Sequence, residues 1–257
     1  MGLELHRFPT TDLAARALAQ AVAADLEAAL TMQERALLLV SGGRSPISLF
    51  AALAQQPLQW QRIDISLADE RSMPTNADAA NAGLVRNSLM VGAASAARWI
   101  PLMTTEVFAA AADPWQAAQQ AASLANSESA LATPAATILG LGNDGHTASL
   151  FPDALQWPHA AETEARYVAL QPTQAPHARV SLSLKALRQQ KRCYLWAVGA
   201  DKLLTLTRLR QVCSEAAAQG IDGSKTLLEA GPVACLIADP VLQLRAYCTE
   251  PVDNFDA

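Results

Sequence analysis

The chain has 257 residues, of which 51% are hydrophobic and 17% charged, a composition typical of packed globular domains and not of a disordered chain. Lys and Arg number 19 against 24 Asp and Glu, giving a formal net charge of -5. This balance argues against the basic surface that nucleic-acid phosphates require. Its N-terminus lacks a signal-like apolar core, and no apolar run reaches the length of a membrane span. We expect a cytoplasmic protein with neither a nucleic-acid nor a membrane partner.

The cysteines argue against disulfide bonds and against a metal site. All four lie in the last third of the chain, and none of them forms a C-x-x-C pair. We therefore expect free thiols in a reducing compartment and no metal site. The four are Cys193, Cys213, Cys235 and Cys248.

The first third of the chain predicts a helix and a buried strand that ends in a glycine-rich turn. Leucine and valine at a four-residue spacing predict an amphipathic helix over residues 11–30. The apolar run over 36–40 is typical of a parallel strand buried on both faces, and S-G-G-R-S-P follows it at 41–46. Pro46 fits the first position of a helix, with Ser45 as its cap. Glycine amides at a helix start favour a phosphate; a plain glycine-rich connection is the alternative.

A second predicted strand leads into a charged loop. The strand is I-D-I-S-L-A at 63–68, and D-E-R-S-M-P follows at 69–74. Arg71 offers a fork of donors for a phosphate, while Asp69 or Glu70 positions the phosphate or contacts sugar hydroxyls. A solvated cluster of surface charges is the alternative interpretation.

The stretch that predicts chemistry lies in the middle of the chain. Residues 136–152 have the sequence A-T-I-L-G-L-G-N-D-G-H-T-A-S-L-F-P, which predicts a strand, a tight turn and a helix. This order places Asp144 and His146 at the carboxyl end of a strand, where open α/β sheets bind ligands. We interpret His146 as a base and Asp144 as the carboxylate that orients it. Gly142 and Gly145 suit a sharp turn with accessible amides. The alternative is a plain turn with a capping aspartate and a surface histidine.

The remaining elements alternate between strands and helices. Helices are expected over 79–89, 114–131 and 203–217, and strands over 99–103, 167–170, 179–184, 193–198 and 242–248. Arg179 begins one of these strands, and Lys202 is the first cation after the next. Both are candidate phosphate ligands, although a structural ion pair is the alternative for Arg179. The alternation predicts an α/β fold in a single domain over 1–257, with a Rossmann-like, mostly parallel sheet and helices on both faces.

Five motifs occur along the chain in a fixed order. They are S-G-G-R-S-P at 41–46, A-D-E-R-S-M-P at 68–74, L-G-L-G-N-D-G-H-T-A-S-L-F-P at 139–152, R-V-S-L-S-L at 179–184 and G-A-D-K at 199–202. Together they resemble the motif set of the 6-phosphogluconolactonase family. The D-G-H turn is shared with the glucosamine-6-phosphate deaminases of the same superfamily, but T-A-S-L-F-P continues as in the lactonases. Ala80 and Lys185 depart from the family's usual serine and proline, outside the expected base and phosphate cradle.

The resemblance implies a sugar-phosphate isomerase/deaminase-like fold and hydrolysis of 6-phospho-D-glucono-1,5-lactone to 6-phospho-D-gluconate. No metal or organic cofactor is expected, because a lactone is already an activated electrophile. In this interpretation His146 activates a water, Asp144 orients the imidazole, and amides around Gly142 and Gly145 stabilise the oxyanion. The residues expected to bind the substrate and its phosphate are Ser41, Gly42, Gly43, Ser45, Asp69, Arg71, Arg179 and Lys202.

Two other functions stay open on the residues alone. A deaminase-like isomerase would use Asp69 to shuttle a proton. A non-catalytic sugar-phosphate sensor would have no need of the pair formed by Asp144 and His146. The expected partner is a small sugar-phosphate lactone, and the expected assembly is a monomer or a weak homodimer.

Overall fold

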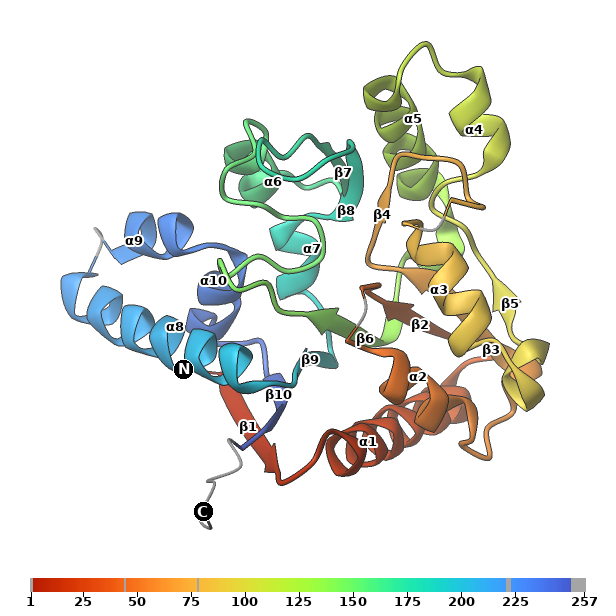
Figure 1. Cartoon of the computed structure of the whole chain (residues 1–257), viewed down its shortest axis with the longest axis horizontal. Helices are drawn as coiled ribbons and strands as arrows, with labels where there is room; N and C mark the ends of the chain where they lie inside the picture. Colours follow the sequence, from red (N-terminus) through yellow and green to blue (C-terminus); the bar gives the residue numbers. More distant parts are fainter. Residues whose placement is uncertain (1, 44, 78, 221–222, 251–257) are drawn as a thin grey trace, which may run out of the picture.

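Two β-sheets form the centre of the computed structural model, which describes residues 2–43, 45–77, 79–220 and 223–250 (Figure 1). The larger sheet has the order β1-β10-β9-β6-β2-β3-β5, and all of its neighbouring strands are parallel. The smaller sheet is antiparallel, with the order β4-β8-β7. The large sheet comprises β1 (Leu3–Phe8), β2 (Ala36–Val40), β3 (Ile63–Leu67), β5 (Arg98–Trp99), β6 (Pro134–Gly140), β9 (Cys193–Ala197) and β10 (Leu244–Thr249), and the small sheet comprises β4 (Asp69–Arg71), β7 (Tyr167–Leu170) and β8 (Arg179–Leu182).

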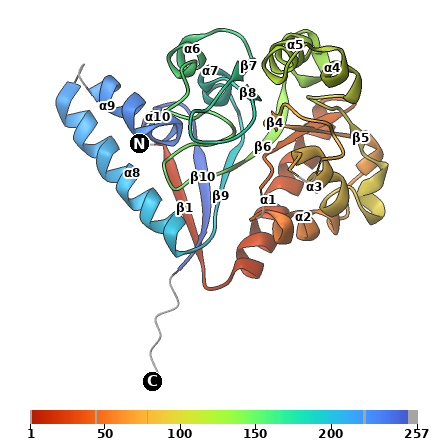
Figure 2. The ribbon, with the colours of Figure 1, turned by 45° about the horizontal axis from the view of Figure 1, so that its top comes forward.

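Helices cover both faces of the large sheet, which confirms the predicted fold class. They are α1 (Thr11–Met32), α2 (Ile47–Ala54), α3 (Asn81–Ser88), α4 (Thr105–Ala110), α5 (Pro114–Ser127), α6 (Trp157–Glu162), α7 (Leu184–Arg188), α8 (Ala200–Gln219), α9 (Gly223–Ala230) and α10 (Pro232–Ala238). Helix α1 packs on β1, β2, β6 and β10, and α5 packs on the small sheet. Figure 2 shows α8 and α10 on one side of β1, β9 and β10, with α1 on the other. None of these helices is long and apolar enough to cross a membrane.

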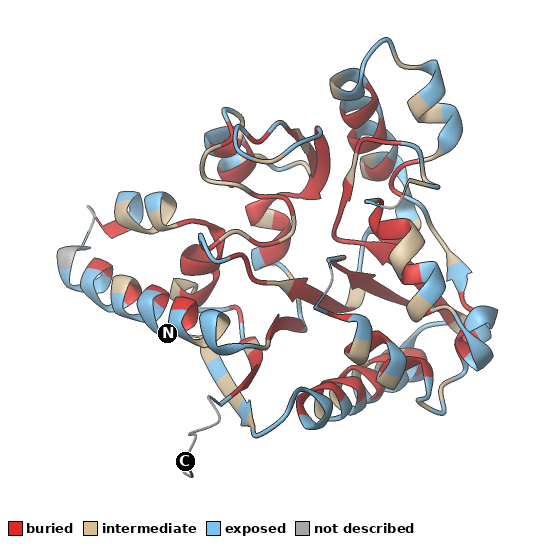
Figure 3. Ribbon diagram, viewed as in Figure 1, coloured by how far each residue is buried: buried red, intermediate tan, exposed pale blue. Residues whose placement is uncertain are grey.

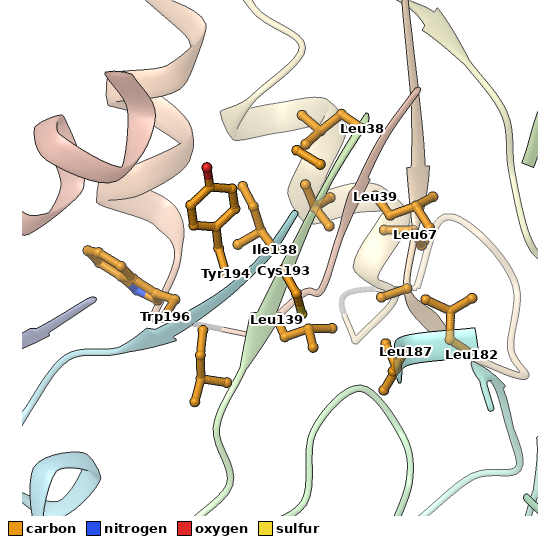
Figure 4. Close-up of a cluster of buried hydrophobic side chains, with 14 of the residues drawn as sticks. Leu38, Leu39, Leu67, Ile138, Leu139, Leu182, Leu187, Cys193, Tyr194 and Trp196 are labelled. Carbon is orange, nitrogen blue, oxygen red and sulfur yellow. The ribbon is translucent and has the colours of Figure 1, made fainter. Parts of the chain in front are cut away.

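The apolar runs in the sequence became the buried interior of the sheet. Every residue of β2, β3 and β9 is buried, as expected for parallel strands covered on both faces (Figure 3). Neighbouring strands contribute side chains to one cluster, including Leu38 from β2, Ile138 from β6 and Tyr194 from β9 (Figure 4). Each of the four cysteines is free and buried.

Strand order fixes where a ligand fits. Strands β2 and β6 are neighbours, but the chain continues from β2 to β3 on one side and from β6 to β9 on the other. The carboxyl ends of β2 and β6 therefore form the point where the strand order reverses, which is where open α/β sheets leave a crevice.

Three local predictions are wrong. Helix α2 begins at Ile47 and has no side-chain cap. Its N-cap is Pro46 and not Ser45, because the first intrahelical hydrogen bond runs from the amide of Phe50 to the Pro46 carbonyl at 2.8 Å. Residues 69–71 form β4 instead of a loop, since they pair with β8. No helix follows the turn after β6: Ala148 has a φ of 49°, and Thr147 instead bridges to Leu150.

Candidate active site

A cleft of about 280 Å³ lies at the carboxyl ends of β2 and β6. All eight residues predicted to bind the substrate line it, together with His146 and Gly142. Asp144 and Gly145 are not among its lining residues. Segments from five parts of the chain thus meet at one place, although the role of each residue stays a prediction.

The Asp144 carboxylate holds the His146 imidazole. Asp144 Oδ1 lies 2.5 Å from Nδ1 of His146 and accepts the backbone N–H of the same residue at 3.2 Å. The hydrogen bond to His146 lowers the pKa of Asp144 to about 2, so the carboxylate is ionised at neutral pH. A carboxylate facing Nδ1 favours the tautomer protonated there, which leaves Nε2 as the acceptor. The pair therefore has the geometry of a base and its orienting carboxylate.

The turn that carries this pair is closed by its own backbone amides. The N–H of Gly142 donates to the His146 carbonyl at 2.8 Å, and the N–H of Gly145 donates to the Gly142 carbonyl at 3.0 Å. Both of these amides therefore already have partners, which corrects the expectation that they bind an oxyanion; an oxyanion contact from another amide of the turn stays a prediction. Gly145 has a φ of +92°, in the left-handed region that favours glycine. A Cβ added at Gly142 would lie 2.1 Å from His146 Nδ1, so a side chain at this position would collide with the imidazole.

The register of the small sheet decides which charges reach the cleft. Arg71 and Arg179 are directly opposite each other in β4 and β8, and opposite residues share one face of a sheet. Alternation puts Asp69 on the same face as Arg71 and turns Glu70 to the other. Burial, with the neighbouring Arg71, lowers the pKa of Arg179. Two opposed guanidinium groups repel each other, so an anion between them is favourable.

Asp69 is not a surface charge. It is 4% exposed, and its Oδ2 accepts the hydroxyl of Ser149 at 2.6 Å. This burial contradicts the alternative that the D-E-R segment is a solvated cluster. The carboxylate lies on the cleft wall, where it is available for a polar contact.

Glu70 has a structural role that the sequence did not indicate. Its carboxylate is 2% exposed and accepts the backbone N–H groups of Arg71, Asn81 and Ala82, each at 2.8 Å. Two of these amides begin helix α3, so Glu70 caps the helix and ties it to β4. The expectation that Glu70 positions a phosphate or contacts a sugar is therefore wrong.

Glu70 predicts a pH dependence of stability. Burial raises its pKa from 4.5 to about 7 against the opposing effect of the three amides. Because the folded pKa is above the unfolded one, the stabilising contribution is complete below about pH 4.5 and is lost as the pH rises through about 7. We expect the free energy of unfolding of the wild type, relative to Glu70→Gln, to fall by on the order of 1–3 kcal/mol across that range. Urea titrations at several pH values measure this difference.

Glu27→Gln, on the exposed side of α1, is the control and should leave the pH dependence of the free energy of unfolding unchanged. If Glu70→Gln also leaves that pH dependence unchanged, the prediction is contradicted.

Lys202 connects another strand end to the turn that carries Asp144 and His146. It lies in the first turn of α8, which follows β9, and its Nζ donates to Asn143 Oδ1 at 2.6 Å. Asn143 directly precedes Asp144 in the chain. The ammonium group is therefore held beside the turn that carries the histidine.

Phe151 and Asn81 are two of the lining residues that had no predicted role. The ring of Phe151 packs on His146 with centroids 4.2 Å apart, and the Arg179 guanidinium lies 5.7 Å from the centre of the same ring. Asn81 begins α3 and also lines the cleft. Only the L-F-P end of the central motif pointed toward Phe151, and no local pattern singled out Asn81. Within the described ranges, no group of three or more His, Cys, Asp or Glu side chains is placed to hold a metal ion.

Comparison with known proteins decides the family. The family model described as glucosamine-6-phosphate isomerases/6-phosphogluconolactonase matches residues 9–228. The chain belongs to this family. Its relatives include a protein of Neisseria meningitidis named 6-phosphogluconolactonase, 40% identical over 77% of this chain and 84% of that one. A Pseudomonas aeruginosa protein of the same name is 41% identical over 75% of this chain and 79% of its own length.

The fold of this family member also agrees with a solved structure. The crystal structure of a 6-phosphogluconolactonase from Shewanella baltica OS155 superposes with a TM-score of 0.83 at 30% identity, covering 96% of this chain and 97% of that one. The resemblance predicted from the five motifs is thus confirmed, both for the family and for its α/β fold.

Proposed function

We propose that this chain is a carboxylic ester hydrolase that converts 6-phospho-D-glucono-1,5-lactone to 6-phospho-D-gluconate, with His146 as the general base. The observation that carries the proposal is the hydrogen-bonded pair of Asp144 and His146 in the same cleft as Arg71, Arg179 and Lys202. An imidazole that can act as a base and a set of cations suit an ester that bears a phosphate at its far end. The family membership and the names of the relatives support the same substrate class.

The proposed reaction uses the two imidazole nitrogens differently. His146 Nε2 takes a proton from water as the water oxygen bonds to the lactone carbonyl carbon, while Asp144 stabilises the imidazolium through Nδ1. The tetrahedral intermediate then breaks its bond to the ring oxygen, and Nε2 returns the proton to that oxygen. The product carboxylic acid ionises and releases one proton. No step requires a metal or an organic cofactor.

The phosphate is held at the cationic wall in this proposal. Arg71 and Arg179 lie on one face of the small sheet, and Lys202 approaches from α8. The glycine turn after β2 contributes Gly42, Gly43 and Ser45 to the same cleft. Gly43 has a φ of +99°, a conformation that glycine adopts without strain, so the turn can present backbone amides to an anion.

Removing either Arg71 or Lys202 should weaken binding without stopping the chemistry. We expect Arg71→Ala and Lys202→Ala each to raise KM for the phospholactone by about 10-fold or more with kcat little changed, because each loses a charge-assisted contact present in both ground and transition states. Steady-state kinetics measure both parameters. Lys225→Ala, exposed on α9, is the matched control. Unchanged KM in both cleft variants would remove these residues from the phosphate site.

The function is tested by following lactone opening directly. Purified protein is added to freshly generated 6-phosphogluconolactone, and proton release is recorded above the spontaneous rate. Acceleration that scales with enzyme concentration is the expected result. Release of ammonia from glucosamine 6-phosphate would instead support a deaminase-like isomerase, and binding of 6-phosphogluconate without lactone turnover would support a sensor.

A further inference from the structure

Asn81 has a buried amide oxygen that the protein leaves unsatisfied. The residue is 2% exposed and lines the cleft. Its Oδ1 has no hydrogen-bond partner among the described residues. Buried polar atoms in native proteins are almost always paired, so an unpaired oxygen at a ligand cleft points to a partner that the ligand supplies.

The orientation of this amide is fixed from the other side. Asn81 Nδ2 donates to the Asp69 carbonyl at 2.8 Å, which assigns nitrogen and oxygen to their positions because a carbonyl accepts only from the nitrogen. The Asn81 backbone N–H is held by the Glu70 carboxylate at the start of α3. The side-chain Nδ2 and the backbone N–H of Asn81 are therefore both bonded to β4, so the position of Oδ1 is fixed before a ligand binds.

The glycine turn after β2 makes room for this oxygen. A Cβ added at Gly42 would lie 1.8 Å from Asn81 Oδ1. Any other residue at 42 would collide with the amide and displace it. The amide oxygen therefore lies against the glycine turn, between this turn and β4.

A second unpaired atom belongs to another residue that lines the same cleft. Ser41 is 6% exposed and lines the cleft, and its Oγ also has no partner within the described part of the chain. An amide oxygen only accepts hydrogen bonds, so it repels a phosphate and attracts a donor. A serine hydroxyl both donates and accepts. Such a pair suits the hydroxyl groups of a sugar.

We propose that Asn81 Oδ1 accepts a hydrogen bond from one ring hydroxyl of the sugar-phosphate lactone, with Ser41 Oγ in the same cleft, and that this contact selects for a hydroxylated sugar. The inference rests on the proposed function and adds to it a residue that determines specificity. It assigns one acceptor at the start of α3 to a sugar hydroxyl, beside the glycine turn and the cations proposed for the phosphate.

The test removes hydroxyls from the substrate one at a time. The 2-, 3- and 4-deoxy forms of 6-phosphogluconolactone are compared with the parent lactone, each corrected for spontaneous opening, in the wild type and in Asn81→Ala. In the wild type, one deoxy lactone should lose about 10- to 100-fold in kcat/KM. In Asn81→Ala, kcat/KM for the parent lactone should fall to a similar level. The difference in kcat/KM between the parent and that deoxy lactone should shrink to within about 3-fold. The two other deoxy lactones should keep their wild-type ratios. Asn87→Ala, exposed on the same helix, should retain every wild-type ratio.

The outcomes separate the inference from the function on which it rests. A wild type that opens no phospholactone overturns the proposed function. A wild type that opens the parent and all three deoxy lactones within about 3-fold of one another overturns the inference alone. A loss of kcat/KM for the deoxy lactone that persists in Asn81→Ala also overturns the inference. A purely structural role of Asn81 would lower kcat/KM for all four lactones together. If Asn81→Ala unfolds, the wild-type series and Asn81→Ser provide the same comparison.

Discussion

Replacing His146 with alanine is expected to lower kcat for phospholactone hydrolysis by about 10²–10⁴-fold and to leave KM nearly unchanged. A positioned general base contributes on that scale, and His146 is held by the Asp144 carboxylate at 2.5 Å at the edge of the cleft. The cations that are proposed to bind the phosphate come from β4, β8 and α8, so the substitution leaves them in place. Initial rates over a range of lactone concentrations, corrected for spontaneous opening, separate the two parameters.

A matched histidine controls for this substitution. His159 lies exposed on α6 and does not line the cleft, so His159→Ala should retain wild-type kcat. If His146→Ala turns over the lactone at near the wild-type rate, the histidine is not the base and the proposed mechanism fails. A large rise in KM with unchanged kcat would instead assign His146 to substrate binding.

Gly142→Ala should be nearly as damaging as the loss of the histidine itself. The added Cβ would lie 2.1 Å from His146 Nδ1 and 2.5 Å from Asp144 Oδ1, far inside contact distance, so the pair has to move. A displacement of about 1 Å in a catalytic group costs on the order of 10²-fold in rate. We expect kcat to fall by at least that factor. Gly142 is not in the left-handed region, so the effect comes from the collision and not from backbone strain.

A glycine elsewhere distinguishes this collision from a general effect of the substitution. Gly83 lies within α3, and a Cβ there meets nothing within 4 Å. Gly83→Ala should keep full activity and raise the free energy of unfolding by about 0.4–1 kcal/mol, because alanine loses less conformational freedom in a helix. Full activity in Gly142→Ala would show that the pair of Asp144 and His146 tolerates the added carbon, contrary to the geometry.

The local turn chemistry at the proposed base was predictable because it is contained in a few consecutive residues. The D-G-H turn carries its own glycines and its own orienting carboxylate, and Asp144 and His146 indeed meet. The same local logic failed just beyond the turn. Thr147 donates to the Gly140 carbonyl at 2.7 Å, and this bond holds the segment against the strand end, where a helix was expected.

The D-E-R segment shows what local patterns leave out. Three residues are too few for a period to separate a strand from a loop, so the pairing of β4 with β8 had to come from contacts distant in sequence. That pairing opposes Arg71 to Arg179 and turns Glu70 toward α3. It also brings the Asp69 carbonyl to Asn81. None of these relationships has a signal within either segment.

By itself, the sequence determined the strands β2, β3, β6, β9 and β10, the glycine turns and the side chains that can do chemistry, because apolar runs and turn residues act over short distances. It did not indicate β1 or β4. Only the tertiary structure decided which charges face one another, which amides of the turn already have partners, and which buried oxygens of the described residues, Asn81 Oδ1 among them, lack one. The physical reason is that facing and burial depend on the register between strands and on packing between segments far apart in the chain.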